Sequence, residues 1–327
     1  MEKLITAFPQ NITDALAIAS NFKVNHQDRE IRNIVICGMG GSGIGGKIVA
    51  QWSQDEISIP VVACQDYILP NFVNQYTLVI GSSYSGNTEE TMISLEKAKE
   101  NGALIIGICS GGNLEDFCIS NGFDVVKVPG GNPPRSAVAF SIVQITNILV
   151  QFGLIDFSAL KKLEIARDLI NENATFIHEE AKHLAAFLKD KVGVFYSVTK
   201  YEPILIRARQ QFNENSKLLC WHHVIPEMNH NELVGWGGGD NRFAAVFFDT
   251  NDLLPRNKKR FDISVDVVKT KTEFVKIISA KGESQIERSI YLINLVDWAS
   301  FYLSELNQVD IMDIKVIDFL KDELSKF

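Results

Sequence analysis

Three things are scarce in this sequence of 327 residues, and each scarcity excludes a class of protein. No apolar run approaches the roughly 20 residues of a membrane span, and Asp14 interrupts the N-terminal stretch where a signal peptide would need its apolar core. The 32 lysines and arginines are outnumbered by 40 acidic residues, for a net charge of −8. Nucleic acids are bound by clustered positive charge, so we expect neither nucleic acid nor membrane as partner. A small anionic substrate is still compatible, because it responds to the charge of a single pocket.

Cysteine is also scarce, and its spacing is irregular. The count is odd, no two cysteines have C-x-x-C spacing, and most lie in or beside apolar runs. We interpret them as reduced core residues and expect a cytoplasmic protein. They are Cys37, Cys64, Cys109, Cys118 and Cys220.

The chain does contain enough length and apolar content for two cores. Hydrophobic residues make up 46% and charged residues 22%, as in ordinary globular proteins. At roughly 150 residues per domain, the length predicts two domains. We expect them at residues 1–153 and 154–327, both α/β, each with a mainly parallel sheet between two layers of helices.

Short β-branched runs alternate with helical patterns in both halves. Strands are expected at residues 32–37, 60–64, 77–81, 104–109 and 124–128, then at 192–198, 219–224, 243–248 and 273–279. Helices are expected at residues 44–52, 88–101, 137–152, within 158–190, and near 200–217, 255–269, 284–306 and 313–325.

Two loops rich in glycine and hydroxyl side chains directly follow predicted strands. The first, residues 38–46, reads GMGGSGIGG, and the second, residues 82–91, reads SSYSGNTEET. Glycines let a backbone approach a ligand closely, and the amides at a helix start point toward an anion. The hydroxyls of Ser83, Ser85 and Thr88 add donors for several oxygens of one phosphoryl group. Both loops would lie at the carboxyl edge of a parallel sheet, where ligands gather.

The first loop alone also fits a nicotinamide dinucleotide site. Gly38, Gly40 and Gly43 satisfy G-x-G-x-x-G, and Asp66 follows at about the spacing of a ribose-binding acid. The second loop argues against this alternative, since a dinucleotide fold does not need a second phosphate cradle. A helix cap and turn cluster is the structural alternative for the three hydroxyls.

These loops resemble the SIS (sugar isomerase) domain, and three further segments narrow the resemblance. They are Pro134-Arg135-Ser136-Ala137, Asn213-Glu214-Asn215-Ser216-Lys217 and the stretch 226–232, PEMNHNE. Together they look like the bifunctional phosphoglucose/phosphomannose isomerase family over nearly the whole chain. The resemblance implies two SIS-type domains, with the active site between them, and a metal-free isomerase without cofactor.

The resemblance also assigns roles to single residues. It implies that the Gly41 amide and the hydroxyls of Ser42, Ser83, Ser85 and Thr88 hold the substrate phosphate. The remaining assignments are Glu214 as catalytic base, His230 as ring-opening group, Arg135 as the cation that stabilises the enediolate, and Lys321 as an active-site lysine. The sequence departs from the family where residues 207–211, RARQQ, lack a lysine often found there, and where 309–311, VDI, replaces the Asp-Pro of many members.

The chemistry of an aldose–ketose isomerase suits these residue types. One carboxylate can remove the proton on C2 and return it to C1 across a planar cis-enediol, which contributes about 10²–10⁴-fold. An arginine supplies a permanent positive charge for the enediolate, and a histidine can exchange protons during ring opening. Glucose 6-phosphate and mannose 6-phosphate lose the same C2 proton, so a pocket tolerant at C2 would convert both to fructose 6-phosphate.

Several alternatives stay open from the sequence. His222, His223 and His230 could suggest zinc, but adjacent histidines on a strand point to opposite faces. A protein that senses phosphosugars without chemistry, or an isomerase of an amino-sugar phosphate, would keep the same loops. Since family members donate a histidine across a dimer interface, we expect a homodimer in which His230 completes the neighbouring subunit's site.

Overall fold

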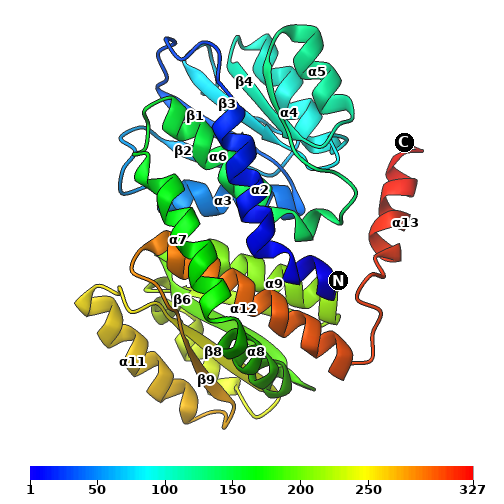
Figure 1. Cartoon of the computed structure of the whole chain (residues 1–327). Coiled ribbons are helices and arrows are strands. Elements are labelled where there is room, and N and C mark those ends of the chain that lie inside the picture. The colour runs from blue at the N-terminus through cyan, green and yellow to red at the C-terminus, as the bar shows by residue number, and fades with distance from the viewer. Residues whose placement is uncertain (327) are drawn as a thin grey trace. The chain divides into compact units, whose positions relative to one another are not determined.

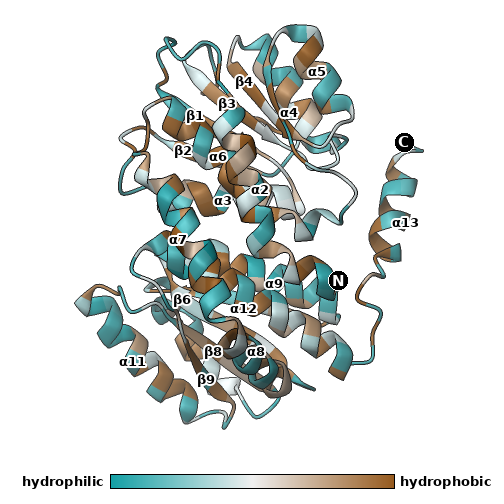
Figure 2. Cartoon of the chain, viewed as in Figure 1, coloured by the Kyte–Doolittle hydropathy of each residue, from teal (hydrophilic) through white to brown (hydrophobic). Residues whose placement is uncertain are grey.

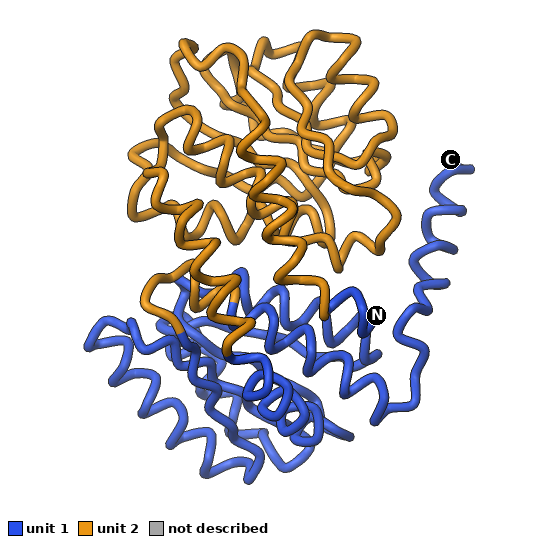
Figure 3. Tube along the Cα trace, viewed as in Figure 1, with its two compact units in different colours: residues 1–5, 173–281, 291–327 blue, residues 6–172, 282–290 orange. Residues whose placement is uncertain are grey.

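The structure is a computed structural model that describes residues 1–326 (Figure 1). The chain forms two compact units, drawn in different colours in Figure 3. One unit contains residues 6–172 and 282–290, and the other contains residues 1–5, 173–281 and the chain from residue 291 onward. The domain boundary expected after residue 153 stays a prediction, although the helix at 158–172 belongs to the first of these units.

The unit of residues 6–172 is built around a five-stranded parallel sheet. Its strand order is β2-β1-β3-β4-β5, so the second and third strands lie on opposite sides of the first. All five strands lie where β-branched runs predicted them: β1 Asn33–Cys37, β2 Val61–Cys64, β3 Thr77–Ser82, β4 Leu104–Cys109 and β5 Asp124–Lys127.

Helices cover both faces of this sheet (Figure 1). On one face Val35, Cys37 and other buried side chains pack against α4 (Glu89–Glu100) and α5 (Asn113–Asn121). On the other face, Ile36 packs closely against α3 (Gly40–Trp52). A Cβ added to Gly46 of this helix would lie only 2.6 Å from the Cγ2 of Ile36. The helices α2 (Phe8–Asn21), α6 (Val138–Gln151) and α7 (Ser158–Glu172) complete this layer.

The second unit contains a four-stranded parallel sheet in the order β7-β6-β8-β9. Alternate side chains of its strands meet helices on opposite faces. Phe195 stacks on Phe212 of α9 (Glu202–Ser216), while Phe247 packs edge-on against Phe261 of α11 (Pro255–Lys269). Both units are therefore three-layered, and the predicted fold class is confirmed. The strands are β6 Val192–Val198, β7 Cys220–Ile225, β8 Phe243–Asp249 and β9 Val275–Ser279.

The other helices complete the layers or carry loops. Those expected from the sequence are α8 (Ala174–Leu188), α12 (Gln285–Leu306) and α13 (Lys315–Leu324). The sequence analysis missed α1 (Glu2–Thr6), α2, α5 and α10 (Glu232–Gly235), and the short 3₁₀ turns η1 Pro134–Ser136, η2 Thr199–Tyr201, η3 Glu227–His230 and η4 Trp236–Gly238.

The hydropathy of the chain follows these layers. In Figure 2, α11 alternates between teal and brown along its length, as a helix with one buried face should. All five cysteines are buried and free, as expected for core residues. Within residues 1–326, no helix combines the length and apolar character required to cross a bilayer.

Candidate active site

The two predicted loops lie at the point where the strand order of the first sheet reverses. From β1 the chain crosses to β2 on one side and then returns to β3 on the other. The strands β1 and β3 are direct neighbours, with Cys37 opposite Gly81. Residues 38–46 follow β1 and residues 83–88 follow β3, so both loops leave adjacent strands at the carboxyl edge. Open parallel sheets bind ligands at this reversal point.

Most of the first loop is helical, because α3 begins at Gly40 and not at residue 44 as expected, so the N-terminal turn of α3 lies within residues 38–46. The amides of Ser42 and Gly43 donate to the carbonyl of Met39, at 3.1 and 2.9 Å. The amides of Gly40 and Gly41 are then the first-turn donors that a helix start offers to a ligand. This first turn contains no acidic residue, so its partial positive charge is not offset locally.

The second loop joins its hydroxyls before α4 begins. The Oγ of Ser83 and the Oγ1 of Thr88 lie 2.8 Å apart, and Ser83 is buried. Ser85 is exposed, and its Oγ accepts the amide of Asn87 at 3.2 Å. Glu89 and Glu90 occupy the first turn of α4, where their charge opposes binding of an anion. An anion therefore fits better at the start of α3, with the second loop contributing hydroxyls from the side.

A hydrogen bond joins the two loops directly. The amide of Tyr84 donates to the Oγ of Ser42 at 3.0 Å, and a Cβ on Gly38 would lie 2.6 Å from the carbonyl oxygen of Ser82. A third segment packs against the first loop, because a Cβ on Gly41 would lie 2.6 Å from the carbonyl oxygen of Pro134. Arg135, the next residue, is 95% buried, with 5% of its surface exposed. These contacts join Gly41, Ser42 and the backbone around Arg135 in one place.

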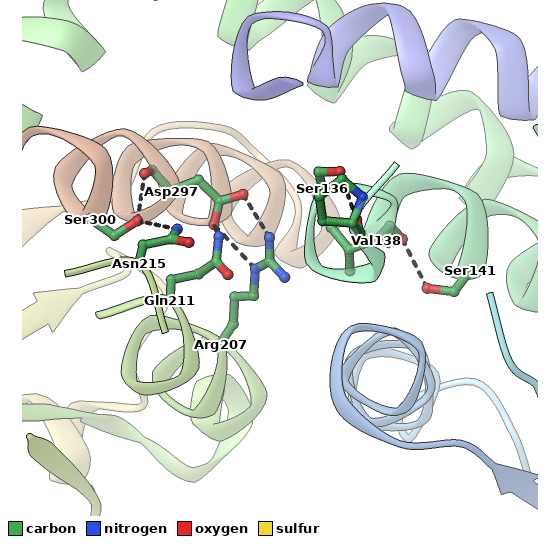
Figure 4. Close-up of polar contacts among 9 residues, drawn as sticks. Ser136, Val138, Ser141, Arg207, Gln211, Asn215, Asp297 and Ser300 are labelled. Carbon is green, nitrogen blue, oxygen red and sulfur yellow. Dashed lines mark hydrogen bonds and ion pairs between the residues drawn. The ribbon is translucent and has the colours of Figure 1, made fainter. Parts of the chain in front are cut away.

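Glu214 belongs to the other unit and lies near the C-terminal end of α9. It is half-buried, and its carbonyl accepts the Lys217 side chain at 2.6 Å. The inward face of the same helix is tied to α12 by polar side chains (Figure 4). Arg207 binds both carboxylate oxygens of Asp297, at 3.2 and 2.7 Å, and Gln211 donates to Asp297 at 2.8 Å.

This polar contact continues along α9 toward Glu214. The Nδ2 of Asn215 donates to the Oγ of Ser300 at 2.9 Å, and the Oγ of Ser216 donates to the carbonyl of Ser300 at 2.6 Å. Burial raises the pKa of Asp297, while the charge of Arg207 acts in the opposite direction. Residues spaced by four along α9 therefore fix the helix that carries Glu214.

His230 ends the 3₁₀ turn η3, which follows β7. Its side chain is exposed, although Met228 in the same turn is fully buried. Val234, four residues further along the chain, is a large apolar residue that is 81% exposed. Of the adjacent histidines, His222 lies 3.7 Å from Glu202, and His223 accepts the amide of Val224 at 2.7 Å. In the described part of the chain, no three His, Cys, Asp or Glu side chains are grouped to hold a metal ion.

Lys321 lies on α13, whose residues are all exposed. The predicted phosphate residues all belong to the unit of residues 6–172, and among them Ser85 has an exposed side chain. Glu214, His230 and Lys321 lie on three separate elements of the other unit. The sequence analysis missed Tyr84, whose hydroxyl accepts the amide of Asn132 at 3.2 Å, and the carboxylate of Glu232, which accepts two aromatic donors.

Comparison with known families defines the class of this protein. Residues 29–124 match the SIS domain, and residues 177–324 match the family described as bacterial phospho-glucose isomerase C-terminal SIS domain. Two solved structures share the fold at low identity. The C-terminal domain of glucosamine-fructose-6-phosphate aminotransferase from Francisella tularensis has a TM-score of 0.79 at 16% identity, covering 95% of this chain and 97% of that one. Tagatose-6-phosphate ketose/aldose isomerase from Escherichia coli has a TM-score of 0.70 at 14% identity, covering 96% of this chain and 97% of that one.

Curated relatives narrow the class to a family. The bifunctional phosphoglucose/phosphomannose isomerase of Caldicellulosiruptor bescii is 37% identical and covers 97% of both chains. That of Aquifex aeolicus is 34% identical over 90% of this chain and 91% of its own. This chain therefore belongs to the bifunctional phosphoglucose/phosphomannose isomerase family. A D-glucosamine-6-phosphate 4-epimerase of Sulfolobus acidocaldarius is also similar, 31% identical over 67% of this chain and 69% of its own.

Proposed function

We propose that this protein interconverts glucose 6-phosphate and mannose 6-phosphate with fructose 6-phosphate by proton transfer. The observation that carries the proposal is the contact between the two loops, where Ser42 accepts the Tyr84 amide at 3.0 Å. That contact holds the two loops together, and in our proposal they form a single anion cradle, as one phosphosugar requires. The printed names of the full-length relatives support the choice of sugar phosphates.

The phosphate would be held by the Gly41 amide and by hydroxyls from both loops. A phosphate binds backbone amides well at a helix start, and hydrogen bonds to a charged group are worth about 1.5–3 kcal/mol each. The hydroxyls are those of Ser42, Ser83, Ser85 and Thr88. This part of the site would bind substrate and transition state equally and would therefore act mainly on affinity.

The chemical step would use groups that the phosphate does not contact. Glu214 takes the C2 proton of the open-chain aldose and returns it to C1, through a cis-enediol. Arg135, buried beside the cradle, balances the negative charge that develops on the enediolate oxygens. His230 exchanges the proton between the ring oxygen and the anomeric hydroxyl during ring opening, and Lys321 assists it.

We also propose a cytoplasmic homodimer in which His230 completes the site of the neighbouring subunit. The exposure of His230, together with the exposed side chain of Val234 four residues further along the chain, supports an interface at this surface. Mixing inactive Glu214→Ala chains with inactive His230→Ala chains should restore part of the activity, because each hybrid dimer would contain one intact site. Absence of any restoration would argue that His230 acts in its own subunit.

Five buried free thiols fit a reducing compartment, which supports the cytoplasmic location that we propose.

Proton NMR in heavy water tests the reaction. Purified protein is incubated with fructose 6-phosphate without added metal or nucleotide. Glucose 6-phosphate and mannose 6-phosphate should appear, both deuterated at C2. Glucose 6-phosphate alone would restrict the function to one epimer, and unchanged fructose 6-phosphate would overturn it. A parallel sample with glucosamine 6-phosphate tests epimerisation at C4, the activity named for the Sulfolobus acidocaldarius relative.

A further inference from the structure

Several hydrogen bonds converge on the carboxylate of Glu232, in the segment from η3 to α10 that carries His230. The indole of Trp236 donates to the hydroxyl of Tyr196 at 2.9 Å, and this hydroxyl donates to Oε1 of Glu232. The indole of Trp221 donates to the same oxygen at 3.3 Å. Tyr196 lies on β6 and Trp221 on β7, so Glu232 connects the segment to two strands of the sheet.

The direction of these hydrogen bonds is fixed by the chemistry of the groups that form them. An indole N–H can only donate, so the oxygen of Tyr196 accepts from Trp236 and its single proton is left for Glu232. Tyr196 is fully buried and its ring stacks on Phe247 at a centroid distance of 4.8 Å. Burial raises the pKa of Tyr196 well above its usual value, so the hydroxyl keeps the proton that it donates.

The other side of His230 is anchored as well. The Nδ2 of Asn229 donates to the Oγ of Ser264 on α11 at 2.7 Å, and Met228 is fully buried. Asn231 caps α10 by accepting the amide of Glu232 at 2.6 Å. The backbone is thus held one residue before His230 and two residues after it. The imidazole between these anchors is exposed, so its position depends on them.

We propose that Glu232 is a positioning residue that, with Tyr196 as its donor, sets the place of the His230 imidazole for ring opening. This inference rests on the proposed function. A proton-transfer group must lie within hydrogen-bond reach of its target, and a displacement of about 1 Å can cost about 100-fold in rate. Glu232 lies two residues from His230 and accepts side-chain hydrogen bonds from Tyr196 and Trp221, which reach it from two strands of the sheet.

The proposal makes a distinction between substrates, because only a cyclic sugar needs ring opening. Erythrose 4-phosphate is an aldose whose phosphate blocks the oxygen that would close a five-membered ring. Its isomerisation still needs the base and the enediolate cation, but not the ring-opening group. Loss of the Glu232 anchor should therefore slow the hexose phosphates selectively.

The experiment compares kcat/KM for fructose 6-phosphate and erythrose 4-phosphate in Glu232→Gln and Tyr196→Phe. We expect a loss of at least about 10-fold for the hexose phosphate and less than about 2-fold for the tetrose phosphate. His230→Ala should show the same selectivity with a larger loss. Tyr291→Phe is the matched control, since Tyr291 is also fully buried but its hydroxyl has no hydrogen-bond partner in the described structure.

A second measurement keeps the test independent of the tetrose phosphate. Exchange NMR reports the interconversion of the two anomers of glucose 6-phosphate, and deuterium uptake at C2 reports the base. In Tyr196→Phe, the rate of anomer interconversion should fall by a larger factor than the rate at which the open-chain sugar takes up deuterium at C2. Equal losses in both steps, or no loss in either, would overturn the positioning role. A wild-type protein inactive on both substrates would instead overturn the proposed function itself.

Discussion

The hydroxyl oxygens of Ser83 and Thr88 lie 2.8 Å apart across the turn between β3 and α4. The amide of Thr88 also points to the Ser83 oxygen, at 3.4 Å. Two hydroxyls this close can reach different oxygens of a single phosphoryl group. Their separation is set by the turn itself, in which the amide of Gly86 donates to the carbonyl of Ser83 at 3.0 Å.

Removing either hydroxyl should weaken substrate binding more than catalysis. We expect Ser83→Ala and Thr88→Val each to raise KM by about 10- to 100-fold, the equivalent of one hydrogen bond to a charged group. Because this bond is present in both ground and transition states, kcat should change less. Steady-state kinetics with fructose 6-phosphate measures both. Thr91→Val is the control, since Thr91 is buried on α4, which follows Thr88, and its hydroxyl has no described partner. A rise in KM there would indicate a general disturbance of α4.

Gly41→Ala should damage the site without unfolding the protein. The new Cβ would lie 2.6 Å from the carbonyl oxygen of Pro134 and 3.0 Å from the Cα of Arg135, so the segment carrying the proposed enediolate cation must shift. A misplacement on the scale of 1 Å predicts a loss of about 100-fold in kcat. Gly237→Ala is the control, because a Cβ there meets nothing within 4 Å. Normal kcat in Gly41→Ala, with an unchanged unfolding transition, would argue that Arg135 acts elsewhere or not at all.

Local sequence was sufficient for the sheets and the loops. Runs such as residues 33–37 and 104–109 have the composition of buried parallel strands, and glycine or serine marks the loops that follow. The helix α5 was missed because it is short and interrupted by polar residues. Its signal was Gly122, which adopts a φ of 70° as the left-handed residue that ends a helix.

The contacts that support the site could not be predicted in the same way. Arg207 and Asp297 are 90 positions apart, and Tyr196 and Glu232 are 36 apart. Neither pair has a local pattern, because each forms only after the strand order brings its elements together. The stretch 207–211, noted in the sequence for lacking a lysine, supplies two of the side chains that bind Asp297. Which residues hold the substrate stays a prediction.

Asp297→Ala should destabilise the protein strongly. Arg207 and Asp297 have side chains that are only 1% and 6% exposed, so removing the carboxylate leaves a buried guanidinium without its counter-ion. Such a loss costs about 3–5 kcal/mol in the free energy of unfolding. Replacing the whole ion pair by two apolar residues of similar volume, in contrast, often leaves the free energy of unfolding unchanged. Urea unfolding of Asp297→Ala measures the cost of losing the carboxylate, and urea unfolding of the double variant Arg207→Met/Asp297→Leu measures the cost of replacing the pair. A double variant as unstable as the single one would show that apolar packing cannot replace this ion pair.

Two buried tyrosines should make the protein sensitive to alkali. Burial raises the pKa of Tyr196 well above its usual value and that of Tyr291 to about 12. Below about pH 10 the folded and the unfolded protein both keep their phenol protons, so the free energy of unfolding has its full value. Above that pH the unfolded chain releases protons that the folded chain retains, so stability falls by about 1.4 kcal/mol per pH unit for each tyrosine. For Tyr291 this fall ends near pH 12, and for Tyr196 it continues further.

The variants Tyr196→Phe and Tyr291→Phe separate these contributions. Each should reduce the slope of unfolding free energy against pH, between about pH 10 and 12, by about 1.4 kcal/mol per unit. Urea unfolding at several alkaline pH values measures the slope, which is independent of any constant loss that Tyr196→Phe suffers with its hydrogen bond to Glu232. A slope equal to the wild type in Tyr196→Phe would mean that this hydroxyl ionises as readily in the folded protein as in water. It could then not act as the fixed proton donor to Glu232 at high pH.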